Sequence, residues 1–458
     1  MTFPNPSLDS VLFSSPVFSP NQTTLPCSAT IRSGELCVGG FSVRSLVEQF
    51  GSPLYILDET HLRWGCRAFV DALKREYAAE ARVLFATKAL CTQAVCAIAR
   101  AEGLGLDVVS EGELVTALAS GAPGETVYLH GNNKSRSELT RAIVNGCTII
   151  LDNWYELELV REIVSAYEGK VARVMPRISP EVESYTYDEV RTGQRDSKFG
   201  FCLSDTERLF GELTNTKGID FVGVHAHLGS QVLTLEPFRR AARVMVDWFV
   251  RAKSVSSSVR ELNIGGGLGV SYLHEENPPS IADYVRLIVG EVTEACRERG
   301  VSLPLLLIEP GRAIAAPAMV TAYTVGSIKD IPEVRRYVAV DGGMSDNPRP
   351  ITYKSKHTVY HADRPLDPKR EVVTIAGRHC ESGDILFKDI ALPHLVSGDI
   401  IVAATTGAYN YSQSSNYNRV PRPAMVLVSG AQVEVIVRRE TVEEMMQNDR
   451  VPARLSAR

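Results

Sequence analysis

Short apolar runs alternate with longer amphipathic stretches across residues 59–312. The apolar runs are RVLFAT, GLDVVS, TVYLHG, CTIILD, VARVMP, FVGVHAHLG, ELNIGGG and LPLLLIEPG. The seven stretches between them, such as TQAVCAIARAEG, have apolar residues three and four apart, and several end in glycine. Strands that alternate with helices pair in parallel, and eight such units close into a barrel. We therefore predict a (β/α)8 TIM barrel over residues 59–312.

After residue 312 the pattern changes to β-rich segments separated by turns rich in proline, glycine and asparagine. These segments are AMVTAYTVGSIKD, RRYVAVDGG, EVVTIAG, DIIVAAT and AMVLVSGAQVEVIVRR. They predict a β-domain over residues 313–445, which the N-terminal segment 34–58 joins through a strand from Pro53 to Leu57. Residues 1–33, rich in serine, threonine and proline, are expected to form a mobile tail, and residues 446–458 a C-terminal tail.

Polar residues gather where the predicted barrel strands end. They are Lys88, Ser110, His130, Asn132, His227, Ser230, Gly265, Gly266, Gly267 and Glu309. The carboxyl ends of the strands form the active face of such a barrel. The site is therefore expected at this end.

Composition and charge narrow the choice of ligand. The 458 residues are 44% hydrophobic with a formal net charge of −5, so no basic field attracts nucleic acid or a membrane surface. The nine cysteines form no C-x-x-C pair, which favours neither a disulfide framework nor a zinc site. We expect a small-molecule ligand and a cytoplasmic protein. Plastid targeting is disfavoured because Asp9 is acidic and no arginine precedes Arg32.

Lys88 follows the first predicted barrel strand, inside the segment LFATKAL. An ordinary surface lysine is one interpretation. At the mouth of the barrel, however, desolvation would lower the amine pKa from ~10.4 and make it nucleophilic. Lys88 is therefore a candidate for Schiff-base chemistry.

The segment LNIGGGLG places three glycines after the seventh predicted strand. Backbone N–H groups there can approach a phosphate without obstruction by Cβ atoms, and barrels often bind phosphate at this point. A tight turn is the alternative explanation. The run is neither a P-loop, because no G-x-x-x-x-G-K-[ST] occurs, nor the dinucleotide fingerprint of an open sheet.

The segment VHAHLGSQ carries His225 and His227 on one face of the sixth predicted strand. A metal would need a third ligand of suitable type, and none is evident, so we expect no metal. One flat imidazole could instead stack on a planar cofactor, and a hydrogen-bonded core histidine is the alternative for each ring. Ser230 could donate to a phosphate oxygen.

The segment LLIEPGR ends the eighth predicted strand with Glu309 and Arg312. A salt bridge between them is one interpretation. The other is that Glu309 keeps a cofactor's ring nitrogen protonated while Arg312 binds a phosphate or carboxylate. A lysine, a glycine cradle, a stacking histidine and this carboxylate together indicate pyridoxal 5'-phosphate.

The chain resembles the fold-type III pyridoxal-phosphate-dependent decarboxylases from about residue 34 to residue 439. The segments that carry the resemblance are FATKAL, GLDVVSEGEL, HGNNKS, TGQRDSKFGF, HAHLGSQ, NIGGGLG, EPGR, DGGMSDNPRP, CESGD and GAYNYSQSSNYNRVPRP, in the family's order. The resemblance implies an alanine racemase-like fold in which Lys88 holds the cofactor, His227 stacks on its ring and Glu309 faces its nitrogen. It places around the cofactor phosphate Ser230, Gly265, Gly266, Gly267 and Tyr409, and Arg312 is counted among the cofactor-binding residues.

The resemblance also gives roles to residues 379–387, HCESGDILF. Members of the family are head-to-tail homodimers in which this loop enters the partner's active site. Cys380 would be the acid that protonates the carbanion left by CO2 loss, and Glu381 would bind the distal amino group. The retained carboxylate would be bound by Arg312, Arg349, Tyr353 and Tyr409. A glutamate after the cysteine favours meso-2,6-diaminopimelate as the substrate, with L-lysine and CO2 as products.

Two alternatives stay open at this point. One is a related decarboxylase of ornithine, arginine or carboxynorspermidine, and the other is a catalytically silent binding protein. The presence of Lys88, Glu309 and Cys380 together argues against a catalytically silent protein. Fine specificity is open because the chain departs from the family pattern at Leu90, Glu111, Tyr185 and Tyr187.

Overall fold

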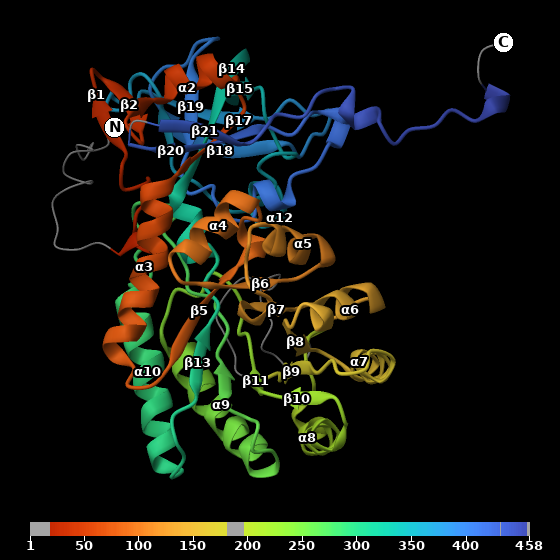
Figure 1. Cartoon of the computed structure of the whole chain (residues 1–458). Helices are drawn as coiled ribbons and strands as arrows, with labels where there is room; N and C mark the ends of the chain where they lie inside the picture. The colour runs from red at the N-terminus through yellow and green to blue at the C-terminus, as the bar shows by residue number, and fades with distance from the viewer. Residues whose placement is uncertain (1–18, 181–196, 431, 456–458) are drawn as a thin grey trace.

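The computed structural model describes residues 19–180, 197–430 and 432–455. It has two parts, a barrel of parallel strands surrounded by helices and a domain built mostly of strands at one end of it (Figure 1). This arrangement confirms the predicted fold class.

The barrel strands follow one another around a closed ring. They are β5 (Ala81–Ala86), β6 (Gly105–Val108), β7 (Val127–Leu129), β8 (Thr148–Leu151), β9 (Ala172–Pro176), β10 (Ile219–Phe221), β11 (Gly223–His225), β12 (Glu261–Asn263) and β13 (Leu305–Ile308). The predicted sixth strand is divided into β10, which pairs with β9, and β11, which pairs with β12. Val222 lies between the two halves. Its backbone N–H donates to the carbonyl of Val174, and its carbonyl accepts the backbone N–H groups of Arg260 and Glu261. The divided strand therefore connects β9 with β12 and closes the barrel.

Within the described residues, seven α-helices lie between the barrel strands, as the sequence pattern predicts. They are α4 (Gln93–Ala101), α5 (Glu111–Ala119), α6 (Arg136–Val144), α7 (Trp154–Ala166), α8 (Thr206–Asn215), α9 (Glu236–Val255) and α10 (Ile281–Glu298), while α3 (Glu59–Glu76) precedes the first strand and the short α11 (Arg312–Ala315) follows the last. Side chains of Thr92, Ser110 and Ser135 accept backbone N–H groups and so begin α4, α5 and α6. Among the described helices, none is both long and apolar enough to cross a membrane.

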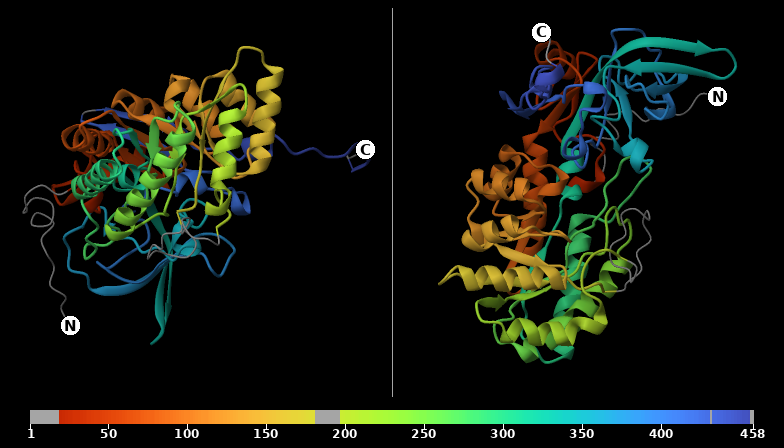
Figure 2. Two further views of the ribbon diagram at one scale, coloured as in Figure 1. Left: turned by 90° about the horizontal axis from the view of Figure 1, so that it is seen from below. Right: turned by 90° about the vertical axis from the view of Figure 1, so that its right-hand side faces the viewer.

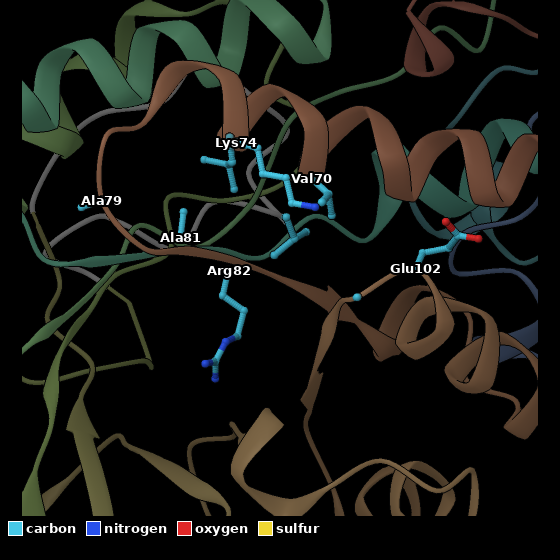
Figure 3. A pocket seen from close by; sticks show the side chains of 9 residues that line it. Val70, Lys74, Ala79, Ala81, Arg82 and Glu102 are labelled. Carbon is cyan, nitrogen blue, oxygen red and sulfur yellow. The ribbon is translucent and has the colours of Figure 1, made fainter.

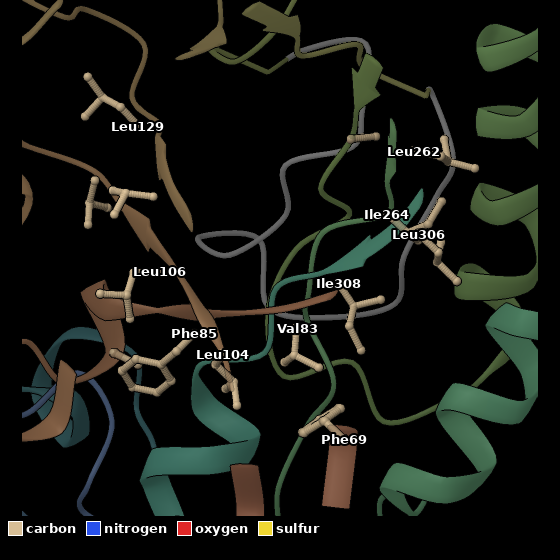
Figure 4. Packing of buried hydrophobic residues seen from close by; sticks show 14 of the residues in the cluster. Phe69, Val83, Phe85, Leu104, Leu106, Leu129, Leu262, Ile264, Leu306 and Ile308 are labelled. Atoms are coloured by element: carbon tan, nitrogen blue, oxygen red, sulfur yellow. The ribbon is translucent and has the colours of Figure 1, made fainter. Parts of the chain in front are cut away.

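The barrel strands bury both of their faces. Figure 4 shows part of the larger of the two clusters, including Val83 and Phe85. In β5, Val83 and Phe85 pack with the large core cluster under the helices, whereas Leu84 belongs to a small cluster inside the barrel. The other members of the inner cluster are Tyr128, Ile150, Met175, Val222 and Leu307. Because the strand interiors are apolar on both sides, polar groups are left to the strand ends and the loops that follow them.

Nine strands of the β-domain form one sheet with a side branch. Its strands are β4 (Leu54–Asp58), β14 (Met319–Ile331), β15 (Arg335–Val340), β16 (Val359–His361), β17 (Glu371–Ala376), β18 (Ile385–Leu392), β19 (Ile400–Ala403), β20 (Ala424–Ser429) and β21 (Gln432–Val437). The order is β18-β17-β15-β14-β4-β20-β21, and β19 pairs with β14 and β16. Strand β4 thus inserts between two C-terminal strands, although it precedes the barrel in the chain. The long hairpin of β14 and β15 projects from this domain, as the right-hand view of Figure 2 shows.

Residues 19–33 differ from the mobile tail expected there. Asn21 is buried and donates its amide to the carbonyls of Gly269 and Pro279, and Cys27 donates its backbone N–H to His61. Residues Thr30–Arg32 form β1, which pairs with β2 (Glu35–Val38), and β3 (Phe41–Ser42) and α2 (Val43–Phe50) follow. A serine- and proline-rich composition did not reveal these long-range hydrogen bonds.

Candidate active site

Lys88 lies in η2 (Thr87–Ala89), directly after β5, and forms an ion pair with Asp107 of β6. Its Nζ atom is 2.7 Å from Oδ2 of Asp107, a fully buried carboxylate. Desolvation alone would lower the lysine pKa, but the Asp107 carboxylate, with smaller effects from Tyr409 and Glu309, raises it above its usual range. The sequence-based expectation of a lowered Lys88 pKa is therefore wrong for the protein alone, because it omitted this partner.

Glu309 stands at the end of β13 in a buried network of polar side chains. Its Oε1 lies 3.0 Å from His130 Nε2 and accepts from Asn263 Nδ2 at 2.7 Å, and its Oε2 lies 3.3 Å from His225 Nε2. Burial would raise the Glu309 pKa, but the two histidines hold it well below its usual range. Burial lowers the pKa of His225 to about 4, so this ring is neutral near pH 7. Glu309 is thus held as a carboxylate in a buried site.

The glycine run forms a close backbone cradle next to His227. Gly265 has φ of +72°, and a Cβ atom on Gly266 would lie 2.0 Å from the carbonyl oxygen of Glu309. Neither position has room for a side chain. The N–H of Gly266 donates to His227 Nδ1 at 3.2 Å, which fixes the orientation of the ring, and burial keeps the His227 pKa well below its usual range.

Arg312 connects the glycine cradle to a group of tyrosines. Its guanidinium donates to Ser230 Oγ at 2.7 Å and to Tyr272 Oη at 2.6 Å, and it lies over the Tyr409 ring at 4.7 Å. The salt bridge between Glu309 and Arg312 that the sequence allowed is not formed, because each side chain binds other partners. Arg312 therefore presents a fixed positive charge beside the cradle.

Arg349, on α12 (Arg349–Thr352) of the β-domain, is the second arginine at this place. It is only 6% exposed and lies within 6 Å of the rings of Tyr272, Tyr353 and Tyr409. Its Nε is buried without a hydrogen-bond partner, and desolvation lowers its pKa. A buried guanidinium with an unused donor is suited to a carboxylate ligand.

Most of the residues predicted to bind the cofactor line one pocket. It is lined by Ala86, Lys88, His227, Ser230, Gly267, Leu268, Glu309, Pro310, Gly311, Arg312 and Tyr409. Lysine, histidine, glycine and carboxylate thus lie around one cavity at the carboxyl ends of the strands, as predicted. Cys380 and Glu381 do not line it, and both are exposed on this chain.

The loop that carries Cys380 is held by its aspartate. Asp384 is buried, and its carboxylate accepts the backbone N–H groups of His379 and Met344 at 2.9 and 2.7 Å. The His379 ring bonds to Ser345 Oγ at 2.8 Å. Asp384 therefore shapes the loop, which leaves the thiol of Cys380 and the carboxylate of Glu381 exposed.

A second pocket lies away from this site, between α3, the first residues of β5 and the turn after α4 (Figure 3). Lys74 and Arg82 line it together with apolar side chains such as Val70 and Val83, and Glu102 at its edge is paired with Arg63. It is at the amino end of β5. This is the end of a barrel that serves stability rather than chemistry.

Sequence reasoning missed three residues of the site. They are Asp107, Asn263 and Tyr272, which bind Lys88, Glu309 and Arg312 respectively. His130 was placed at a strand end but was given no role, and the structure shows it 3.0 Å from Glu309. A usable signal was present for Asp107, because a charged residue interrupts the buried run GLDVV. Among the departures from the family pattern, Leu90 is buried in the core and Glu111 pairs with Arg141 on the surface, whereas Tyr185 and Tyr187 lie outside the described residues.

His130, His225 and Glu309 also lie close enough together to hold a metal ion. The atoms that would bind it already face one another, since His130 and His225 both contact the Glu309 carboxylate. A hydrogen-bonded network that fixes a carboxylate explains this group in terms of contacts that the structure contains.

Comparisons with known proteins identify the class. The model for the pyridoxal binding domain of pyridoxal-dependent decarboxylases matches residues 63–316. Diaminopimelate decarboxylase of Synechocystis is 46% identical over 99% of this chain and 98% of the relative, and that of Bacillus subtilis is 42% identical over 91% and 95%. A crystal structure of diaminopimelate decarboxylase from M. jannaschii in complex with L-lysine has a TM-score of 0.88 at 32% identity, covering 96% of this chain and 100% of the other. The chain belongs to the diaminopimelate decarboxylase family.

Proposed function

We propose that this protein converts meso-2,6-diaminopimelate into L-lysine and CO2 with pyridoxal 5'-phosphate as its cofactor. The observation that carries the proposal is that Lys88, Glu309 and Gly267 of the glycine run line one pocket. Full-length relatives named for this activity, and a similar structure that holds L-lysine, support the choice of substrate.

The residues present fit the cofactor. Gly265 and Gly266 pack too closely against backbone to carry a side chain, so the cradle offers backbone alone, and Ser230 and Arg312 supply a hydroxyl and a positive charge beside it for a phosphate. The N–H of Gly266 fixes the orientation of the His227 ring beside the cradle, and a ring held in this way can stack on an aromatic cofactor. When bound, pyridoxal phosphate supplies an electron sink for the carbanion that decarboxylation creates.

Glu309 and Lys88 provide the charges that this chemistry needs. Glu309 remains ionised, because its pKa is held well below its usual range, so it can hold a proton on a ring nitrogen placed against it. Asp107 keeps the Lys88 amine within the pocket and favours its protonated form. Lys88 would hold the cofactor, and its amine must first lose the proton that Asp107 favours.

Specificity requires recognition of the far end of the substrate. Meso-diaminopimelate carries an ammonium and a carboxylate there, and we assign the carboxylate to Arg349, Arg312 and Tyr353, with Tyr409 beside them. Glu381 would bind the distal ammonium. Ornithine has no distal carboxylate, so it would leave the buried guanidinium of Arg349 unpaired.

We further propose a homodimer whose active sites are shared between subunits. Cys380 and Glu381 are exposed and absent from the pocket lining of their own chain, which is expected if they complete the partner's site. Cys380 would then protonate the carbanion. A cytoplasmic location fits the nine cysteines, all of which are free.

The test is an assay of the purified holoenzyme with meso-diaminopimelate, in which L-lysine and CO2 should appear in equal amounts. Lys88→Ala is the control and should form neither. A protein that binds pyridoxal phosphate but releases no CO2 from any amino acid would support the silent binding protein instead.

A further inference from the structure

A short turn connects the Cys380 loop to the C-terminal segment of the chain. This turn is η8 (Tyr417–Arg419). The side-chain oxygen of Asn418 accepts the backbone N–H of Cys380 at 2.9 Å, and the ring of Tyr417 lies 5.6 Å from the ring of His379. The residue proposed as the acid is therefore held by a hydrogen bond from outside its own loop.

The base of the Cys380 loop is held independently of this turn. Asp384 binds the backbone N–H of His379, and the N–H of Glu381 donates to the carbonyl of His379 at 2.8 Å. The backbone N–H of Cys380 itself donates to Asn418. The position of Cys380 along the loop thus depends on where Asn418 is placed.

The turn has an uncommon backbone. Asn418 and Arg419 have φ of 53° and 57°, two consecutive residues in the left-handed region. Asparagine tolerates this region better than most residues, whereas arginine does so at a cost of order 1 kcal/mol or more. Such a conformation persists when surrounding contacts hold it.

The C-terminal segment, residues 440–449, supplies those contacts. Arg419 donates to the Met445 carbonyl and to Asp449 Oδ2, both at 2.8 Å. Asn416 donates to Glu440 Oε2 at 2.6 Å. In Figure 1 the chain beyond the β-domain runs outward from it towards the C-terminus. The segment is also attached by Glu440, which bonds to the backbone of Arg422, and by Glu444, which pairs with Arg438.

We infer that Asn418 is a positioning residue for Cys380, and that the C-terminal segment holds Asn418 in place through Asn416 and Arg419. The inference rests on the proposed function, in which Cys380 is the acid. The C-terminal segment would thus help to deliver the proton to one face of the carbanion, although none of residues 440–449 lines the pocket around Lys88.

When Asn418 no longer holds Cys380, the enzyme should lose control over how the carbanion is protonated, while it still binds the substrate. If Cys380 moves by about 1 Å, the proton transfer slows, and a misplacement of that size can cost up to ~100-fold in rate. Water can then protonate the carbanion from either face. The substrate-binding groups do not depend on Asn418, because the Glu381 N–H is held by the His379 carbonyl and Arg349 lies on α12, so KM should change little.

The experiment compares four variants of the full-length holoenzyme. Asn418→Gly removes the acceptor while tolerating the left-handed backbone, and Asn418→Asp keeps an acceptor oxygen at the same place. Arg419→Ala releases the C-terminal segment. Arg286→Ala is the matched control, because the Arg286–Asp283 pair is also 2.8 Å long and the two arginine side chains are similarly exposed, 60% and 58%.

Three quantities are measured for each variant. They are kcat and KM for meso-diaminopimelate, the configuration of the deuterium placed on Cε of L-lysine in D2O, and the rate at which iodoacetamide alkylates Cys380 without substrate, resolved by peptide mass spectrometry. Cys27 and Cys202, which are also exposed, are internal references for the alkylation. The alkylation rate reports on Cys380 even in an enzyme that lacks activity.

Asn418→Gly and Arg419→Ala should lower kcat by ~10- to 100-fold with a nearly constant KM, give lysine labelled in both configurations, and alkylate faster at Cys380. Asn418→Asp should keep a single configuration, and Arg286→Ala should match the wild type. Unchanged labelling and alkylation in Asn418→Gly, or equal losses in Asn418→Gly and Asn418→Asp, would overturn the inference. A wild-type enzyme that releases no CO2 from diaminopimelate would instead contradict the proposed function.

Discussion

The amine of Lys88 is 2.7 Å from the buried carboxylate of Asp107, and this ion pair reverses the effect that burial alone would have on the lysine. The protein without cofactor therefore holds Lys88 protonated at neutral pH. A nucleophilic amine must lose that proton before it reacts with an aldehyde.

Asp107→Asn should speed the capture of pyridoxal phosphate by the cofactor-free protein at pH 7.5. Removing an opposite charge at this distance lowers an amine pKa by about 1 to 3 units, so the neutral fraction rises roughly tenfold or more. Stopped-flow absorbance measures the rate, and borohydride should fix the cofactor on Lys88. An unchanged or slower capture would show that Asp107 does not control the lysine.

Glu309→Gln should retain the cofactor but lose activity. The glutamine keeps the size of the side chain near Asn263, but it cannot carry the charge that holds a proton on the ring nitrogen. Loss of such a preorganised charge costs on the order of 10²- to 10³-fold in kcat. Visible absorbance measures occupancy and lysine formation measures kcat; full activity with full occupancy would argue against this role.

His357 should make unfolding more favourable as the pH falls. Burial lowers its pKa to about 4 in the folded protein from 6.5, so between these values the unfolded chain binds a proton that the folded chain does not. Stability therefore increases with pH in this window and is lost as the pH falls from 6.5 towards 4. In denaturant titrations, His357→Gln should reduce the slope of unfolding free energy against pH by up to ~1.4 kcal/mol per pH unit. Parallel curves for the two proteins would contradict the expectation.

Mixing two inactive variants tests whether the active site is shared. If Cys380 serves the partner's pocket, Lys88→Ala and Cys380→Ala subunits that exchange at random should recover roughly a quarter of wild-type activity, because half of the dimers are mixed and each has one intact site. Lysine formation after mixing is the measurement. No recovery, with exchange proven by mass-labelled subunits, would mean that each chain builds its own site.

The fold was predictable because its signals are periodic and local. Alternating apolar runs and amphipathic stretches gave the barrel and its seven α-helices, whereas the division of the sixth strand at Val222 was missed, as were β16 and β18 of the β-domain and the small sheet of β1 to β3. That division arises from pairing with two neighbours, which no single segment encodes. The docking of Asn21 on the barrel was missed for the same reason.

The site was predictable in its residues but less so in its electrostatics. Lys88, His227 and Glu309 could be found because strand ends in a barrel converge. The direction of the Lys88 pKa shift could not, since it depends on Asp107, which is 19 positions away in the sequence and faces the amine only after β5 and β6 pair.

The most direct test of the account is the ratio of kcat/KM for meso-diaminopimelate to that for ornithine, measured on the wild type and on Arg349→Ala. An unpaired buried guanidinium costs on the order of 3 to 5 kcal/mol, so the wild-type ratio should be ~100- to 1000-fold or more, and Arg349→Ala should reduce it sharply while the cofactor spectrum stays intact. Arg349→Lys, which keeps the charge but not the planar fork, should fall between the two. Turnover of ornithine as fast as that of diaminopimelate by the wild type would contradict the account and favour a related decarboxylase.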